Sequence, residues 1–294
     1  MLLRGTFLRA VTLALSATTF ALSAHAAAPL DRTRVFVVTE SHDLVLVPAA
    51  APGTILASVK LTGLEADEHI LGIDYRIARG VMFAMGSSGR IYTVAVDSGV
   101  LTPVGKAPFP YPLEGSRFGF DFNPAADRIR IVSDSGQNLR AHPDTGALVD
   151  AAPDEPGLQS DGALAYATGD TNAGRPPRIV AAAYTYNTQD EKLTTNFAID
   201  ADAATLVRQG SLEGVQPVVS PNTGQLTTVG KLGVDGIVDA HFDISDVANT
   251  ALAAIRTAHP SSTTLYRIDL ASGRAQALGP IGNGAALRGL AIEP

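Results

Sequence analysis

The chain has 294 residues, a formal net charge of −7, 46% hydrophobic and 17% charged residues, 28 glycines and no cysteine. The acidic balance disfavours nucleic acids and anionic membrane surfaces as partners, because both carry negative charge. The lack of cysteine excludes disulfides and a cysteine-linked lipid anchor, and the apolar content argues against disorder.

The first 26 residues have the pattern of a cleavable export signal. Arg4 and Arg9 precede an apolar stretch that ends at the small-residue triplet Ala24-His25-Ala26. Cleavage there would leave residues 27–294 as a single domain and, by removing two arginines and no acid, move the net charge from −7 to −9. The alternative is an N-terminal membrane anchor, for which the apolar stretch is short. The pattern predicts a periplasmic or extracellular protein.

Five short segments resemble one another, each an extended apolar run with a small or acidic residue near its centre. They are LGIDYR (71–76), FGFDFN (118–123), GALAYA (162–167), AHFDIS (240–245) and RGLAIE (288–293). Further short strands and turns such as DSG, DTG, NTG and ASG follow them, which is typical of hairpins. The chain is therefore expected to be an all-β repeat protein.

The spacing of these segments indicates the kind of repeat. Taking Asp74, Asp121, Ala165, Asp243 and Ala291 as equivalent positions gives intervals of 47, 44, 78 and 48 residues. Three of the intervals suit one four-stranded propeller blade. The pattern predicts a closed β-propeller of five four-stranded blades, and the long interval leaves a sixth blade open.

The two ends of the repeat region complement each other. RVFVVTE, DLVLVPA and TILASVKL begin the region with no first strand before them, and the final RGLAIEP has no further strands after it. Joining the ends would complete one blade and remove exposed sheet edges. We therefore expect the N- and C-terminal strands to share a blade.

Three segments carry a family resemblance: FGFDFNPAADRIRIVSDSGQNLRAHPDTG (118–146), DGALAYATGDTNAG (161–174) and QLTTVGKLGVD (225–235). They resemble the domain-of-unknown-function 4394 family of uncharacterised exported bacterial proteins. The resemblance implies a propeller-like fold and export. It supplies no catalytic or binding residue.

The acidic residues at the strand centres are the first candidates for a site. If the segments line a central channel, Asp74, Asp121 and Asp243 converge there and could hold a divalent cation such as Ca²⁺, which takes six to eight oxygens. The alternative is structural, with each carboxylate accepting hydrogen bonds from backbone N–H groups. Alanine at two of the five positions breaks any complete ring of acids.

The basic candidates belong to the same segments. His241 lies two residues before Asp243, so alternation places both side chains on one face of a strand. Arg117 and Arg288 could bind an anionic ligand through two parallel hydrogen bonds, or could pair with neighbouring acids. A structural histidine and structural ion pairs are the alternatives.

No catalytic constellation is evident in the sequence, which contains neither a G-x-S-x-G elbow nor a phosphate-binding loop. The first functional hypothesis is accordingly a monomeric binding module for an unknown protein or small-molecule ligand. One alternative is a carboxylate- or metal-dependent hydrolase, lactonase-like or glycosidase-like, with its site at the channel; the absence of tryptophan disfavours the carbohydrate version. Another alternative is a structural envelope or matrix protein. A cofactor is not specified beyond the divalent cation.

Overall fold

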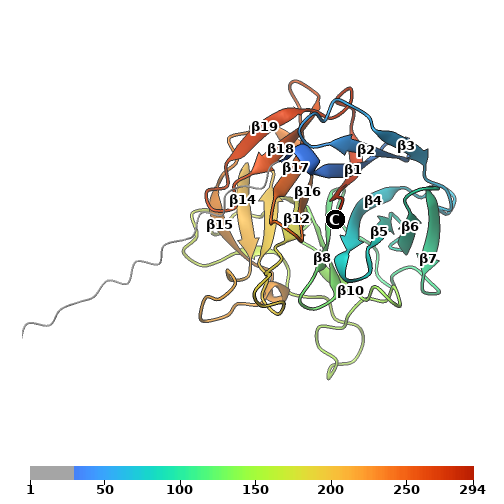
Figure 1. Ribbon diagram of the computed structural model, residues 1–294. Coiled ribbons are helices and arrows are strands. Elements are labelled where there is room, and N and C mark those ends of the chain that lie inside the picture. The colour runs from blue at the N-terminus through green and yellow to red at the C-terminus, as the bar shows by residue number, and fades with distance from the viewer. Residues whose placement is uncertain (1–29) are drawn as a thin grey trace, which may run out of the picture.

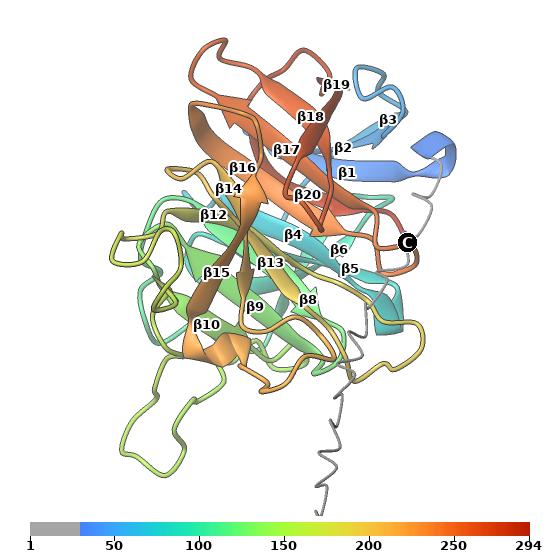
Figure 2. The same cartoon turned by 90° about the vertical axis from the view of Figure 1, so that its left-hand side faces the viewer.

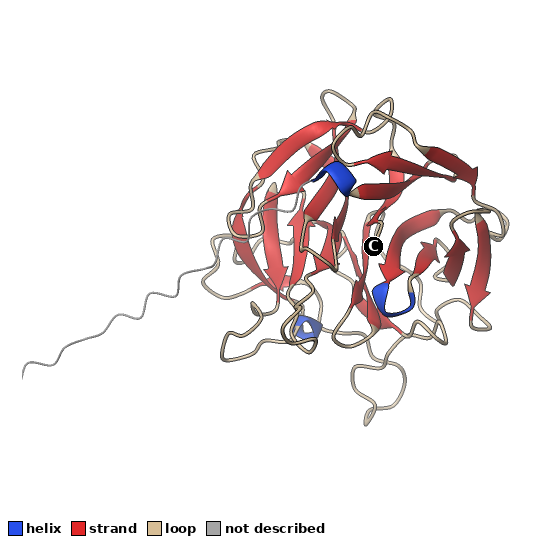
Figure 3. Cartoon of the chain, in the orientation of Figure 1, coloured by secondary structure: helices blue, strands red, loops and turns tan. Residues whose placement is uncertain are grey.

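The computed structural model describes residues 30–294, so the predicted export signal lies outside the described residues. Short strands make up nearly all of the regular structure (Figure 3), and the helices described are single 3₁₀ turns at η1 (Leu30–Arg32), η2 (Ile77–Arg79) and η3 (Pro221–Thr223). No helix between residues 30 and 294 has the length and hydropathy to cross a membrane. The strands form five sheets that surround a common axis as blades (Figure 1). The five-blade propeller prediction is confirmed.

The blades follow one another in chain order. In each blade the strand named first lies next to the axis and the strand named last lies at the outer edge. Blade 1 contains β20 (Leu287–Ile292), β1 (Arg34–Thr39), β2 (Asp43–Pro48) and β3 (Ala57–Lys60). Blade 2 contains β4 (Ile70–Arg76), β5 (Val81–Gly86), β6 (Ile91–Ala95) and β7 (Val100–Val104). Blade 3 contains β8 (Phe118–Asn123), β9 (Arg128–Ser133) and β10 (Asn138–Ala141). Blade 4 contains β12 (Ile179–Tyr184), β13 (Asn196–Asp200), β14 (Thr205–Gln209), β15 (Gln225–Lys231) and β11 (Ala165–Tyr166). Blade 5 contains β16 (Ile237–Ile244), β17 (Ala251–Thr257), β18 (Thr263–Ile268) and β19 (Ala275–Pro280).

Blade 1 is assembled from both ends of the described chain. β20 pairs antiparallel with β1, with Val37 opposite Leu290 and Val35 opposite Ile292. The inner strands contact one another in the order β20, β4, β8, β12 and β16, and β16 in turn contacts β20. The expectation that the terminal strands share a blade is therefore met.

Blade 4 departs from the sequence prediction. Ala165 was expected on an inner strand, but it lies on β11, which pairs in parallel with the outer strand β15. The inner strand is β12, where Ala183 occupies the position equivalent to Asp74. The long interval from Ala165 to Asp243 holds β12, β13, β14 and β15, whereas the 142–164 connection between β10 and β11, the yellow-green loop that leaves the body in Figure 2, precedes it. The uniform four-strand expectation is also wrong here, because blade 3 has three strands and blade 4 has five.

The apolar core lies between neighbouring blades rather than in one central mass. Five clusters of buried side chains occupy the five blade junctions. At the junction of blades 2 and 3, for example, the rings of Phe83 and Phe122 meet edge to face with centroids 5.1 Å apart. Alternation along each strand supplies side chains to both of its faces, so every blade is covered on two sides.

Small residues bring the inner strands close to the axis. Gly72, Gly119 and Gly289 stand two residues before the central position of β4, β8 and β20. A Cβ added at these glycines would lie 2.5 Å from Phe120 Cβ, 2.5 Å from Ala182 N and 2.9 Å from Ile73 Cγ1, respectively, each on the next blade. Glycine is therefore required for the close approach of the strands, which makes the axial channel narrow.

Candidate functional site

Three carboxylates meet on the axis of the propeller, as the sequence pattern suggested. Asp74 on β4, Asp121 on β8 and Asp243 on β16 each place one carboxylate oxygen within 4.8 Å of the other two. Their residues are only 5%, 3% and 6% exposed. We call these three residues the axial carboxylate cluster. They come from blades 2, 3 and 5, so the cluster spans the channel.

Each carboxylate of the cluster also ties its own blade to the next one. The backbone N–H that it accepts belongs to the residue one past the central position of the following inner strand. Phe122 donates to Asp74 at 2.7 Å, Tyr184 to Asp121 at 2.9 Å, and Ile292 to Asp243 at 2.6 Å. Both sequence hypotheses thus find a counterpart in the geometry, since the aspartates converge and also accept backbone hydrogen bonds.

The buried negative charges of the cluster oppose one another. Burial raises the pKa of Asp74, and the charges of Asp243 and Asp246 raise it further. Burial likewise raises the pKa of Asp121 strongly, with Asp74 as the next contributor, and it raises the pKa of Asp243 to about 6. The bonds from the backbone act in the opposite direction, because they stabilise the charged form. The cluster therefore favours uptake of positive charge, as protons or as a cation.

Asp246 is a fourth acid near the cluster that sequence reasoning missed. It lies just beyond the end of β16, and its partial burial together with the charge of Asp243 raises its pKa to about 7. Because it also acts on the pKa values of Asp74 and Asp121, it adds to the negative potential at this end of the channel. The sequence shows Asp246 three residues after Asp243, in the run FDISD. Because Asp246 lies in a loop, the alternation of side chains along a strand could not predict that it points toward the cluster.

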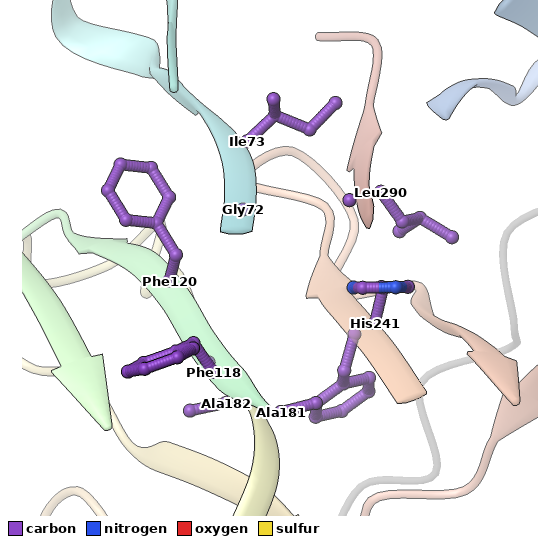
Figure 4. Close-up of a pocket in the computed structure, with 11 residues that line it drawn as sticks. Gly72, Ile73, Phe118, Phe120, Ala181, Ala182, His241 and Leu290 are labelled. Atoms are coloured by element: carbon purple, nitrogen blue, oxygen red, sulfur yellow. The ribbon is translucent and has the colours of Figure 1, made fainter. Parts of the chain in front are cut away.

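His241 lies two residues before Asp243 on β16. Its side chain is therefore in the channel at the level of Gly72 and Leu290, and not at the level of the carboxylates. Its ring reaches from β16 into the space beside Leu290 and opposite Gly72 (Figure 4). Its Nε2 atom is buried and has no hydrogen-bond partner within residues 30–294. The cavity at this layer measures about 10 Å³, which is about the space for one water molecule. An organic substrate does not fit at this layer.

The two candidate arginines do not join the cluster. Arg117 stands directly before β8 and Arg288 is the second residue of β20, so both lie where inner strands begin. At about 3.3 Å per residue, that places Arg117 roughly 13 Å and Arg288 roughly 10 Å along their strands from the central positions. The Arg117 Nε atom lies 3.1 Å from the Asp239 carboxylate of blade 5, across the mouth of the channel.

A second buried polar group, the Arg130 cluster, lies between blades 3 and 4. Arg130 is 1% exposed and donates to Asp161, Asn138, Asn222 and the Tyr184 hydroxyl. Arg140 donates two further bonds to the same Asp161 carboxylate, at 2.8 and 2.7 Å. The Arg130 cluster is a structural polar network, because Asp161 is paired with both arginines and both of its carboxylate oxygens are used.

Comparisons with solved structures find only distant similarities among the neighbours named here. A protein from Lactobacillus plantarum is 17% identical with a TM-score of 0.37, the alignment covering 88% of this chain and 71% of that one. A proposed 6-phosphogluconolactonase from Bacteroides uniformis is 15% identical with a TM-score of 0.37, covering 90% and 72%. A protein of unknown function from Bacteroides thetaiotaomicron is 14% identical with a TM-score of 0.39, covering 83% and 49%. No curated protein matches the chain.

The family comparison also covers most of the chain. A model of the family described as "Domain of unknown function (DUF4394)" matches residues 43–291. That range holds most of the five blades and the whole axial carboxylate cluster. The match therefore shows that the chain belongs to the DUF4394 family.

Proposed function

We propose that the protein is an exported propeller binding module with a divalent cation held on its axis by Asp74, Asp121 and Asp243. The main support for this proposal is that three buried carboxylates converge without a basic partner. No arginine, lysine or histidine in residues 30–294 forms a salt bridge with any of them. Export is inferred from the pattern of residues 1–26.

Electrostatics explains why the cluster needs a positive charge. Two carboxylates at 4.8 Å repel each other by about 3 kcal/mol at an effective dielectric constant of about 20. Three such pairs cannot remain ionised in a buried site without compensation. Protons neutralise the cluster at low pH, and a cation can do so at neutral pH while also bridging three blades.

The size and chemistry of the cluster favour Ca²⁺ over softer metals. All three donors are carboxylate oxygens, which suit hard cations such as Ca²⁺, Mg²⁺ and Mn²⁺. Two oxygens bound to the same Ca²⁺ lie no more than roughly 4.6–5.2 Å apart, given Ca–O distances of about 2.3–2.6 Å. The oxygens of the cluster, all within 4.8 Å of one another, fall inside this limit. Each carboxylate oxygen that accepts an N–H retains a second lone pair for an ion.

A hydrolase centred on the same carboxylates receives less support. Glycoside hydrolysis needs two acids on either side of a sugar in an open cleft. Here the three residues are at most 6% exposed, and the neighbouring channel layer has space for about one water. A small ion can reach such a site, whereas a lactone or sugar cannot. A partner protein or small-molecule ligand would accordingly bind to the outer loops.

Thermal unfolding of the purified protein tests the proposal. The protein is treated with EDTA, and its melting temperature is measured at pH 7.5 without metal and with Ca²⁺, Mg²⁺, Mn²⁺ or Zn²⁺. A cation present at about 100 times its dissociation constant adds about 2.7 kcal/mol of stability. We expect Ca²⁺ to have the largest effect, and the effect to shrink at pH 5, where protons compete for the carboxylates.

Two variants make the test specific to the cluster. Asp121→Asn keeps an acceptor for the Tyr184 N–H but removes one charge, and should abolish most of the Ca²⁺ effect. Asp269→Asn is the matched control, because Asp269 also accepts a backbone N–H but lies in an exposed turn of blade 5. An equal Ca²⁺ response in the two variants, or no cation response in the unmodified protein, would refute the cation site.

A further inference from the structure

Three basic side chains gather at the start of the inner strands where blades 1 and 2 meet. Arg288 is the second residue of β20, and its neighbour Leu287 pairs with Thr39 at the end of β1. His42 occupies the turn that follows, where its backbone N–H donates to the Thr39 carbonyl at 2.9 Å. The turn carrying His42 therefore lies beside Arg288.

His69 approaches the same place from blade 2. It directly precedes β4, and β4 contacts β20 closely enough that a Cβ on Gly289 would lie 2.9 Å from Ile73. Burial lowers the pKa of His69, and the positive charge of Arg288 lowers it further. The pKa of His42 is lowered in the same order by burial and by Arg288, with His69 contributing as well. The three groups thus lie within electrostatic range of one another.

Among residues 30–294, none of these three side chains forms a salt bridge with an acid. Arg288 forms no salt bridge or side-chain hydrogen bond within residues 30–294, and its Nε atom is buried without a partner. The Nε2 atom of His42 is buried and unpartnered as well. The buried guanidinium of Arg130, by contrast, has four acceptors. The Nε atoms of Arg90, Arg117 and Arg208 are also buried without a hydrogen-bond partner, but no pair of histidines is described beside them.

The two acids whose charges act on these histidines, Asp43 on His42 and Glu68 on His69, are already engaged elsewhere. Asp43 accepts hydrogen bonds from Ser41 and Thr39, and Glu68 accepts from Ser88 and Tyr92. Neither forms a hydrogen bond with Arg288 or with an imidazole of the group. A buried donor that lacks an acceptor costs about 1–3 kcal/mol, so the arrangement favours an acceptor from outside the chain.

We infer that Arg288, His42 and His69 form a binding site for an oxyanion, either a carboxylate or a phosphate group. A guanidinium presents parallel N–H donors that match two oxygens of such a group, and imidazole N–H groups supply further donors. The site is independent of the axial carboxylate cluster, from which it is separated by roughly 10 Å along the inner strands. The proposed site makes the end of the channel at which the inner strands begin a ligand-binding face.

The test uses sodium phosphate and sodium acetate as probes, each titrated at constant ionic strength against sodium chloride. Imidazole resonances of His42 and His69 are followed by NMR, together with the melting temperature. We expect saturable shifts of both histidines with at least one probe, and the tighter probe identifies the ligand class. Shifts that sodium chloride reproduces, or no saturation with either probe, would overturn the site.

Variants locate the response. Arg288→Gln and His69→Gln should each weaken binding of the effective probe at least tenfold. His42→Asn should do the same, and asparagine is chosen because His42 has a φ of 61°, a conformation that asparagine tolerates. Arg274→Gln is the control, since it removes one exposed positive charge from blade 5 and should leave the affinity unchanged. Equal loss in Arg274→Gln and Arg288→Gln would show a general charge effect and contradict the proposal.

Discussion

The Arg130 cluster and the axial carboxylate cluster are both buried polar groups that join neighbouring blades, yet their charges are arranged in opposite ways. In the first, one acid, Asp161, lies between two arginines and every described carboxylate oxygen is used. In the second, three acids face one another and only backbone N–H groups compensate them. The first cluster is complete within the chain, whereas the second gains from a proton or cation. The difference separates a structural polar group from a candidate binding site more clearly than burial does.

The same chemical change should therefore have opposite effects in the two clusters, and the largest is expected at Asp161. Asp161→Asn removes the only negative charge between Arg130 and Arg140 and leaves a buried guanidinium uncompensated. Breaking such a pair costs about 3–5 kcal/mol. Denaturant unfolding at pH 7.5 measures the loss. A loss below about 1 kcal/mol would mean that the cluster is not the structural element described here.

The next largest effect concerns pH in the metal-free protein. The pKa of Asp243 is raised to about 6 and that of Asp246 to about 7, both above the ordinary value of 3.8. A raised pKa in the folded state contributes stability that is complete at low pH and is lost as the pH rises through the folded-state value. We expect the free energy of unfolding to fall by on the order of 3 kcal/mol between pH 5 and pH 8. Denaturant titrations in EDTA follow it, and saturating Ca²⁺ should flatten the profile. Stability that instead rises over this range would contradict the assignment.

Asp121→Asn is the counterpart of the Asp161 variant on the axis. Without metal at pH 8 it should raise the free energy of unfolding by about 1–3 kcal/mol, because it removes repulsion and keeps the bond from Tyr184. Asp121→Ala loses both the charge and the acceptor, so it should be less stable than the asparagine variant. Unfolding of the two variants in EDTA separates charge from hydrogen bonding. Equal destabilisation by both substitutions would show that the charge of Asp121 stabilises the fold, and would contradict the expected relief of repulsion.

The smallest effect is expected at Arg140, on the partly exposed side of the Arg130 cluster. Its replacement by methionine leaves Asp161 paired with Arg130, so charge balance is maintained. The loss of its two hydrogen bonds should cost about 1–2 kcal/mol. Denaturant unfolding beside Asp161→Asn provides the measurement. A cost as large as that of Asp161→Asn would show that both arginines are required.

The inner strands were predicted correctly from the sequence where an aspartate stands at the centre of the repeated segment. Asp74, Asp121 and Asp243 recur at the centre of inner strands because each accepts a backbone N–H from the next blade. Such an aspartate is absent from β12, whose central position is Ala183, and the segment around Ala165 has a similar small-residue pattern at the edge of the sheet. Apolar periodicity alone cannot distinguish an inner strand from an outer one, so blade 4 was assigned incorrectly.

Site residues were predictable only when they lay on those inner strands. The convergence of the three aspartates follows from equivalent positions in a ring, and sequence counting finds such positions. Asp246 and His42 lie in turns, whose direction depends on tertiary contacts rather than on strand alternation. His69 precedes its strand by one residue, and only the contact between β4 and β20 places it near Arg288. Proximity between blades is therefore the information that the sequence lacks.

The pairing of β20 with β1 has a consequence for the order of assembly. Val37 and Leu290 are neighbours in the sheet but 253 positions apart along the polypeptide. One edge of β1 (34–39) therefore stays unpaired until nearly all of the downstream chain has been synthesised. Contacts of such long sequence separation slow the search for the native state. Blade 1 should accordingly be the last to become protected from hydrogen exchange during refolding, well after blades 2 and 5.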